Sequence, residues 1–139
     1  MTAEEKKKEL ALYRLRQADE TLDEAEFLFV GKKSPRAIIN RAYYAMFYAV
    51  LALLIFEPYS SSKHSGVLSY FNRRFIKEGL LSERAGESIN TAFELRQRGD
   101  YREYAELGYE QVKPYIQKAR EFIAEVRNYL KLQSLMQII

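Results

Sequence analysis

Four polar side chains stand at positions where a helical pattern calls for apolar ones. Arg41 interrupts an apolar stripe with helical spacing, Arg96 continues another stripe, His64 leads a third, and Asp100 follows Arg96 by four residues. A charge on an apolar stripe must be paired or must face a cleft, because desolvation costs several kcal/mol. These residues therefore predict a polar cleft in which cations could hold an anion and the histidine could take part in catalysis.

Each of these residues also has a structural interpretation. Arg41 lies in the first two turns of its predicted helix and could simply reach solvent. Arg96 falls in a last turn, where a cation suits the helix dipole. Asp100 and Glu103 match a helix-capping pattern, and a histidine such as His64 commonly starts a helix or fills a core. These alternatives stay open at the level of the residues.

The composition excludes several other kinds of site. The chain has 139 residues, no cysteine and one histidine, so disulfides, zinc fingers, iron–sulfur clusters and any site within one chain that needs two histidines are ruled out. No glycine-rich phosphate loop occurs, and the carboxylates are dispersed, so we expect no metal and no cofactor. A net charge of +3 permits an acidic or nucleic-acid partner without requiring one.

The elements that position these residues are predicted to be helices. Apolar residues recur at spacings of 3 and 4 in residues 11–29 and 112–130, and helical segments are expected between them at 35–57, 62–78 and 82–98. Thr2, Ser34 and Ser82 mark helix starts. Gly31, Gly79 and Gly99 are predicted to follow helix ends. The fold class is therefore all-α, an antiparallel up-and-down bundle of four to five helices in a single domain, residues 1–139.

The second predicted helix is apolar nearly all round. Residues 42–56 contain no charge, but a membrane helix needs about 20 apolar residues, so we expect a central core helix, no membrane and a cytoplasmic protein without a targeting segment. A surplus apolar face could meet another subunit, and its expected surface residues are Met46, Phe47, Val50 and Leu54. The tyrosines of this helix, Tyr44 among them, are expected in the core with a hydroxyl to satisfy.

Three segments of the sequence resemble the HEPN family, in its small stand-alone prokaryotic branch. The segments are AIINRAYYAMFYA at 37–49, SKHSGV at 62–67 and ELRQRGDY at 94–101. They occur in the family's order and spacing, and the resemblance spans about residues 8–131. It implies a helical bundle of four to five helices that forms a homodimer.

The resemblance also implies a function. Family members are commonly encoded beside a minimal nucleotidyltransferase as toxin–antitoxin pairs, and many are metal-independent ribonucleases with an arginine and a histidine at a dimer cleft. Here Tyr101 stands where the family's histidine would follow Arg96. The implied catalytic residues are Arg96, Asp100, Tyr101 and His64, and the implied substrate-binding residues are Arg41, Lys63 and Tyr44.

The resemblance leaves alternative functions open. A non-catalytic module could bind a nucleotide or RNA through the same cations, with Asp100 holding Arg41 or Arg96. His64 could replace the missing motif histidine if the chain is a ribonuclease. A nucleotidyltransferase partner could modify Tyr101 or Tyr104, because some toxins of the family are silenced by nucleotides added to a tyrosine beside the motif.

Overall fold

The structure, a computed structural model, describes residues 1–59, 63–100 and 107–133. Within these residues every regular element is a helix, so the all-α prediction is confirmed. The elements are α1 (Ala3–Val30), α2 (Pro35–Leu54), α3 (His64–Phe71), a π-helical turn (Asn72–Lys77), α4 (Glu83–Asp100), α5 (Tyr109–Val112) and α6 (Pro114–Leu132).

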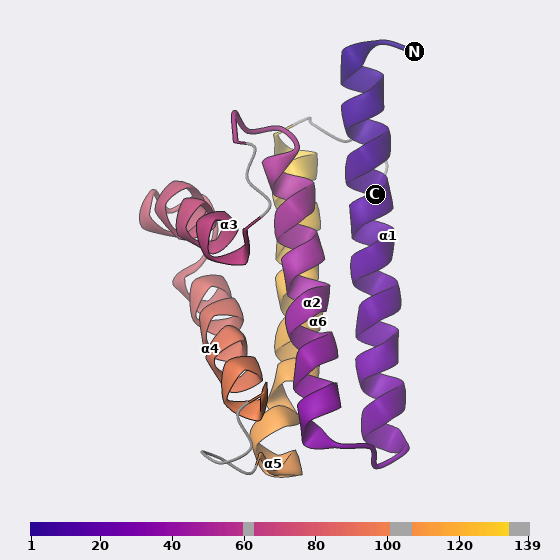
Figure 1. Cartoon of the computed structure of the whole chain (residues 1–139). Coiled ribbons are helices and arrows are strands. Elements are labelled where there is room, and N and C mark those ends of the chain that lie inside the picture. The colour runs from indigo at the N-terminus through magenta and orange to yellow at the C-terminus, as the bar shows by residue number, and fades with distance from the viewer. Residues whose placement is uncertain (60–62, 101–106, 134–139) are drawn as a thin grey trace.

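The four long helices run alternately up and down the bundle. In Figure 1, α1 and α4 descend while α2 and α6 ascend, and α3 crosses beside the top of α4. The predicted apolar stripe of α1 is buried from Ala11 to Ala25. The last predicted stripe is buried from Val112 to Leu130, although Val112 belongs to the one-turn α5 that precedes Pro114.

The helix starts agree with the sequence. The Thr2 and Ser34 hydroxyls accept hydrogen bonds from the backbone N–H groups three residues later, at 3.1 and 3.2 Å. The Ser82 hydroxyl does the same at 3.1 Å and also contacts the Glu125 carboxylate. These caps satisfy donors that a helix leaves unpaired at its first turn.

Of the three glycines predicted to follow helix ends, only one does so in the predicted conformation. Gly79 adopts the left-handed conformation at φ 78° as predicted, but Gly31 does not (φ −78°), and Lys32 takes that conformation instead at φ 55°. Gly99 is also not a helix-ending glycine, because α4 continues through Asp100. A side chain at Gly99 would approach Arg36 to 2.9 Å, so the glycine permits close packing within the helix.

Helix α2 forms the centre of the bundle, packed against α1, α4 and α6. It is long and apolar enough to span a membrane by length and composition, but two thirds of its most apolar window is buried inside the protein, as in a core helix. The predicted outer face was wrong, because Met46, Phe47, Val50 and Leu54 are buried against the other helices. The half-buried stripe is the opposite one, consisting of Ala37, Arg41, Tyr44, Tyr48 and Leu51.

A π-helical turn follows α3 directly and precedes the loop that leads to α4. Within it the amide of Asn72 donates to the Leu68 carbonyl at 2.9 Å and exchanges two hydrogen bonds with the Asn90 amide of α4, at 3.0 and 2.9 Å. The same carbonyl also accepts the backbone N–H of Asn72. The amide pair therefore fixes α3, which begins at His64, against α4, which carries Arg96.

Candidate functional site

Two adjacent tyrosine rings of α2 lie at the centre of the candidate site. Tyr43 is fully buried, whereas Tyr44 is half-buried. Their ring centroids are 5.2 Å apart in an edge-to-face arrangement. Neighbouring residues of a helix point in different directions. The Tyr43 ring therefore faces the core, while the Tyr44 ring reaches the surface.

Arg96 of α4 brings a guanidinium against both rings. Its Cζ atom lies 5.5 Å from the Tyr43 centroid and 5.1 Å from the Tyr44 centroid, which is the range of a cation–π contact. Its Nε atom is buried and has no hydrogen-bond partner within the described part of the chain. The two tyrosine rings therefore hold the guanidinium beside the half-buried Tyr44.

His64, the first residue of α3, reaches the same two rings. Its imidazole stacks on Phe47 with centroids 4.1 Å apart and lies 5.5 Å from the Tyr44 centroid. Burial, and after it the charge of Arg96, lower the pKa of His64 below its ordinary value. The ring is therefore largely neutral at neutral pH, and a neutral imidazole has one nitrogen that can accept a proton.

The Tyr43 hydroxyl is the polar contact that orients this imidazole. It lies 3.4 Å from His64 Nδ1, a long hydrogen bond. Burial raises the pKa of Tyr43 well above its ordinary value, against a smaller opposing effect of Arg96. The phenol thus stays protonated and can donate to Nδ1 or accept from it. In the second case Nε2 of His64 is the free proton acceptor.

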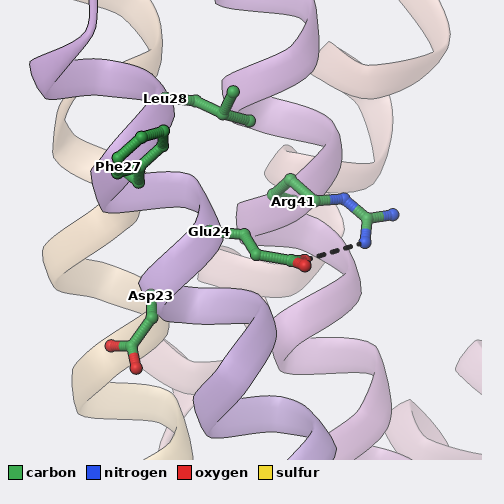
Figure 2. Close-up of a pocket in the computed structure, with 5 residues that line it drawn as sticks. All are labelled: Asp23, Glu24, Phe27, Leu28 and Arg41. Atoms are coloured by element: carbon green, nitrogen blue, oxygen red, sulfur yellow. Dashed lines mark hydrogen bonds and ion pairs between the residues drawn. The ribbon is translucent and has the colours of Figure 1, made fainter.

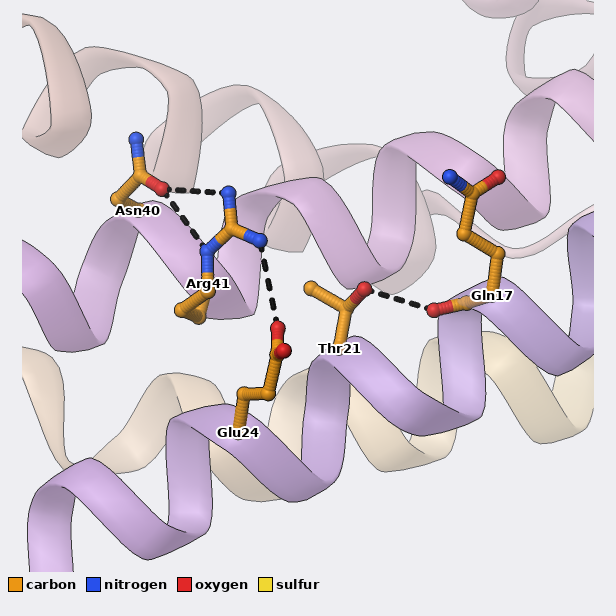
Figure 3. Close-up of polar contacts among 5 residues, drawn as sticks. All are labelled: Gln17, Thr21, Glu24, Asn40 and Arg41. Atoms are coloured by element: carbon orange, nitrogen blue, oxygen red, sulfur yellow. Dashed lines mark hydrogen bonds and ion pairs between the residues drawn. The ribbon is translucent and has the colours of Figure 1, made fainter.

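Arg41 places a second guanidinium against Tyr44, with its Cζ 5.3 Å from the ring centroid. Figure 2 shows it facing Glu24 of α1 across a groove, and their side chains are 3.4 Å apart. Figure 3 shows its other edge held by the Asn40 side-chain oxygen, at 3.0 and 2.8 Å. The pair with Glu24 is largely exposed, so it contributes little to stability and leaves Arg41 able to exchange partners.

The structure brings four of the predicted site residues together: Arg41, Tyr44, His64 and Arg96. Lys63 is the exposed N-cap residue of α3, next to His64. Asp100 is the last residue of α4, within the helix rather than in a turn, and its side chain lies outside the described residues. Tyr101 and Tyr104 also lie outside the described residues.

Sequence reasoning missed two residues that shape the site. Tyr43 and Phe47 were assigned only to the core or to a subunit contact, yet they hold His64 by a hydroxyl contact and by ring stacking. Their spacing of four places them on one face of α2. That spacing could have suggested that both side chains contact the same residue of another helix. It could not have shown that this residue is His64.

Within residues 1–59, 63–100 and 107–133, no three histidine or acidic side chains are grouped so that they could hold a metal ion. The chemistry that the described residues offer is therefore that of two guanidiniums and one neutral imidazole beside aromatic rings.

The sequence profile of the HEPN domain matches residues 11–129. A "UPF0332 protein" of Thermotoga maritima is 42% identical over 125 residues, which cover 90% of this chain and 94% of the relative. A Methanocaldococcus jannaschii protein named "Putative toxin" is 34% identical over 116 residues, covering 84% of this chain and 78% of the relative. This chain therefore belongs to the HEPN domain family.

Proposed function

We propose that this protein is a toxin-type HEPN protein that cleaves RNA at a site centred on Arg96 and His64. The observation that carries the proposal is that these two side chains, 32 positions apart in the sequence, lie against the same pair of tyrosine rings. The toxin assignment is supported by relatives in Methanocaldococcus jannaschii that carry that word in their names.

The two groups suit cleavage through the neighbouring ribose hydroxyl. A neutral His64 would accept the proton of the 2′-hydroxyl while the 2′-oxygen forms a bond to phosphorus. The bond from phosphorus to the 5′-oxygen breaks, and that oxygen takes a proton from solvent. The Arg96 guanidinium, which lies against the two tyrosine rings, would hold the extra negative charge of the phosphorane. The products are a 2′,3′-cyclic phosphate and a 5′-hydroxyl.

The test is RNA cleavage in the presence of a metal chelator. We expect the wild type to release fragments with cyclic phosphate ends, and Arg96→Met and His64→Gln to lose at least about a hundredfold in rate. Arg98→Met is the matched control, because Arg98 is exposed on the same helix. Equal rates in all four proteins, or no cleavage by the wild type, would refute ribonuclease activity.

A second candidate function is binding of RNA or a nucleotide without cleavage. It is favoured by the two guanidiniums on Tyr44, which could hold a phosphate while the half-buried ring stacks on a base. Salt-sensitive binding of a short RNA that is lost in Arg41→Met and Arg96→Met, with no cleavage, would establish this function in place of the first.

We also propose that the protein acts in the cytoplasm as a homodimer regulated by a minimal nucleotidyltransferase. The family membership supports this partnership. Tyr101 and Tyr104 are the proposed acceptors of added nucleotides, since both follow Arg96 closely in the sequence. Co-expression with a neighbouring nucleotidyltransferase gene should raise the mass of the chain, and Tyr101→Phe or Tyr104→Phe should abolish the shift. An unchanged mass beside an active partner enzyme would refute the modification.

A further inference from the structure

The last turn of α1 presents large apolar side chains to solvent. Phe27 is 74% exposed and Val30 is 79% exposed, three residues apart on the helix. Apolar side chains that are clustered and exposed commonly mark an interaction surface. Phe27 shares a groove with Arg41, but the cleavage proposed at Arg96 and His64 uses neither Phe27 nor Val30.

A groove lies on each side of this turn. The first has a volume of about 590 Å³ between α1 and α2, and Phe27 and Leu28 line it together with Arg41. Figure 2 shows Phe27 projecting from α1 at this groove. The second, of about 320 Å³, lies between α1 and α6 and is lined by Val30 and Lys113 among others. The apolar turn is thus a ridge between two hollows that side chains of a partner could enter.

The residues that follow the ridge are positively charged. Lys32, Lys33 and Arg36 are exposed in the loop and in the first turn of α2, and Lys113 is exposed at the second groove. None of the four has an acidic partner within the described part of the chain. The nearby Arg120 is neutralised by Glu26. Among the described residues, the apolar ridge therefore has an excess of cations over acidic partners at one end.

From this combination we propose that the end of α1 is a docking surface for an acidic amphipathic segment of another protein. Leucine-like side chains of that segment would enter the two grooves around Phe27 and Val30, and its carboxylates would face Lys32 and Lys33. The cations that favour an acidic occupant lie at the loop end of the ridge, whereas Asp23 and Glu24 lie at its other end. A flat membrane or a nucleic-acid backbone would leave the grooves unfilled. The observations therefore favour a protein segment with complementary charge.

The surface also gives the bound segment a direction. Asp23 and Glu24 line the first groove one helical turn before Phe27, whereas the lysines follow Val30. The acidic side chains of the partner should therefore cluster towards the loop at residues 31–34. The neutral or basic side chains of the partner should lie over Asp23.

The experiment uses a labelled helical peptide of about 16 residues with leucines on one face and glutamates on the other, titrated with the full chain. Backbone amide shifts should localise to residues 26–36 and 109–120. Phe27→Ser with Val30→Ser should raise the Kd about tenfold or more, and so should Lys32→Glu with Lys33→Glu. The matched control is Lys6→Glu with Lys7→Glu, at the exposed far end of α1, which should leave the Kd unchanged.

The proposal is overturned by any of three results. One is no binding at about 100 μM peptide in low salt, and another is equal binding of a peptide in which lysines replace the glutamates. The third is an equal Kd for the ridge variants and the far-end control.

Anionic vesicles and a short RNA are titrated in parallel. If either binds in a manner that depends on Phe27 and Val30 while the acidic peptide does not, the occupant is of that other class. Because Arg96 and His64 are unchanged in these variants, RNA cleavage reports on the proposed function separately.

Discussion

Arg96 is the residue whose surroundings depart most from what stability alone would favour. A guanidinium is ordinarily matched by a carboxylate when it leaves water, yet its Nε is buried without a partner in the described residues and aromatic rings surround it. Such a group costs folding free energy. The proposed binding role would account for an arginine at this position of α4.

The first prediction follows from this cost. Arg96→Met keeps an unbranched stem against Tyr43 and Tyr44 but removes the unpaired donor. We expect its free energy of unfolding to lie within about 1 kcal/mol of the wild type or above it, while anion binding is lost. Urea denaturation measures the first quantity. A loss of several kcal/mol would show that Arg96 holds the bundle together rather than serving a ligand.

A second prediction concerns the pH dependence of stability. The pKa of His64 is lowered in the folded protein by burial and then by Arg96, so the unfolded chain binds a proton where the folded chain does not. The contribution of His64 is therefore complete above its ordinary pKa of 6.5 and falls as the pH drops below it. Between about pH 7.5 and 5.5 the wild type should lose more stability than His64→Gln in urea denaturation. Parallel pH profiles for the two proteins would contradict the lowered pKa.

The sequence predicted some of these residues because a charged side chain on an apolar stripe can be recognised from spacing alone. Arg96 and His64 were identified in this way. The role of Tyr43 could not be predicted, because a buried tyrosine has the same pattern whether its hydroxyl meets a backbone carbonyl or an imidazole from another helix. The contact with His64 depends on how α3 crosses α2, which no local pattern specifies.

At the scale of elements, the π-helical turn is the connection that sets His64 against Arg96. It continues α3 and is held to α4 by the reciprocal amide pair of Asn72 and Asn90. The sequence predicted one helical segment over 62–78 but not the change of winding inside it. The turn is accompanied by side-chain contacts that no local pattern specifies, because the Asn72 amide donates to the Leu68 carbonyl and pairs with Asn90 of another helix.

The third prediction tests this connection. Asn72→Ala removes three hydrogen bonds and leaves the partly buried Asn90 amide without its partner. The free energy of unfolding should fall by about 1–3 kcal/mol, measured by urea denaturation. Asn128→Ala is the control, because that asparagine is exposed on α6, and it should change stability by less than about 0.5 kcal/mol. Equal effects of the two substitutions would show that the amide pair contributes nothing.

At the scale of the whole molecule, α2 has an outward stripe that the other helices cover only in part. Ala37, Tyr44, Tyr48 and Leu51 are all half-buried on one face of an otherwise buried helix. The sequence predicted that an apolar face of α2 would remain, but it placed that face on the wrong side. Spacing shows how many faces are apolar and does not show which of them the neighbouring helices cover.

The fourth prediction is that the proposed homodimer uses this stripe. Leu51→Arg would place a charge on it without disturbing the buried side of α2, so the chain should remain folded and become monomeric. Light scattering at micromolar concentration measures the mass, and circular dichroism reports the fold. Lys77→Glu, an exposed change outside the stripe, should leave the dimer intact. A wild-type chain that is already monomeric, or a dimer unaffected by Leu51→Arg, would contradict this assignment.

The most direct test of the central claim is a double-mutant cycle on RNA cleavage with Arg96→Met and His64→Gln. Residues that act as a unit show strongly non-additive losses. If the two side chains form one site, the double variant should be about as slow as the slower single variant. If the two losses in rate multiply, Arg96 and His64 act independently, and the shared site proposed around Tyr43 and Tyr44 is wrong.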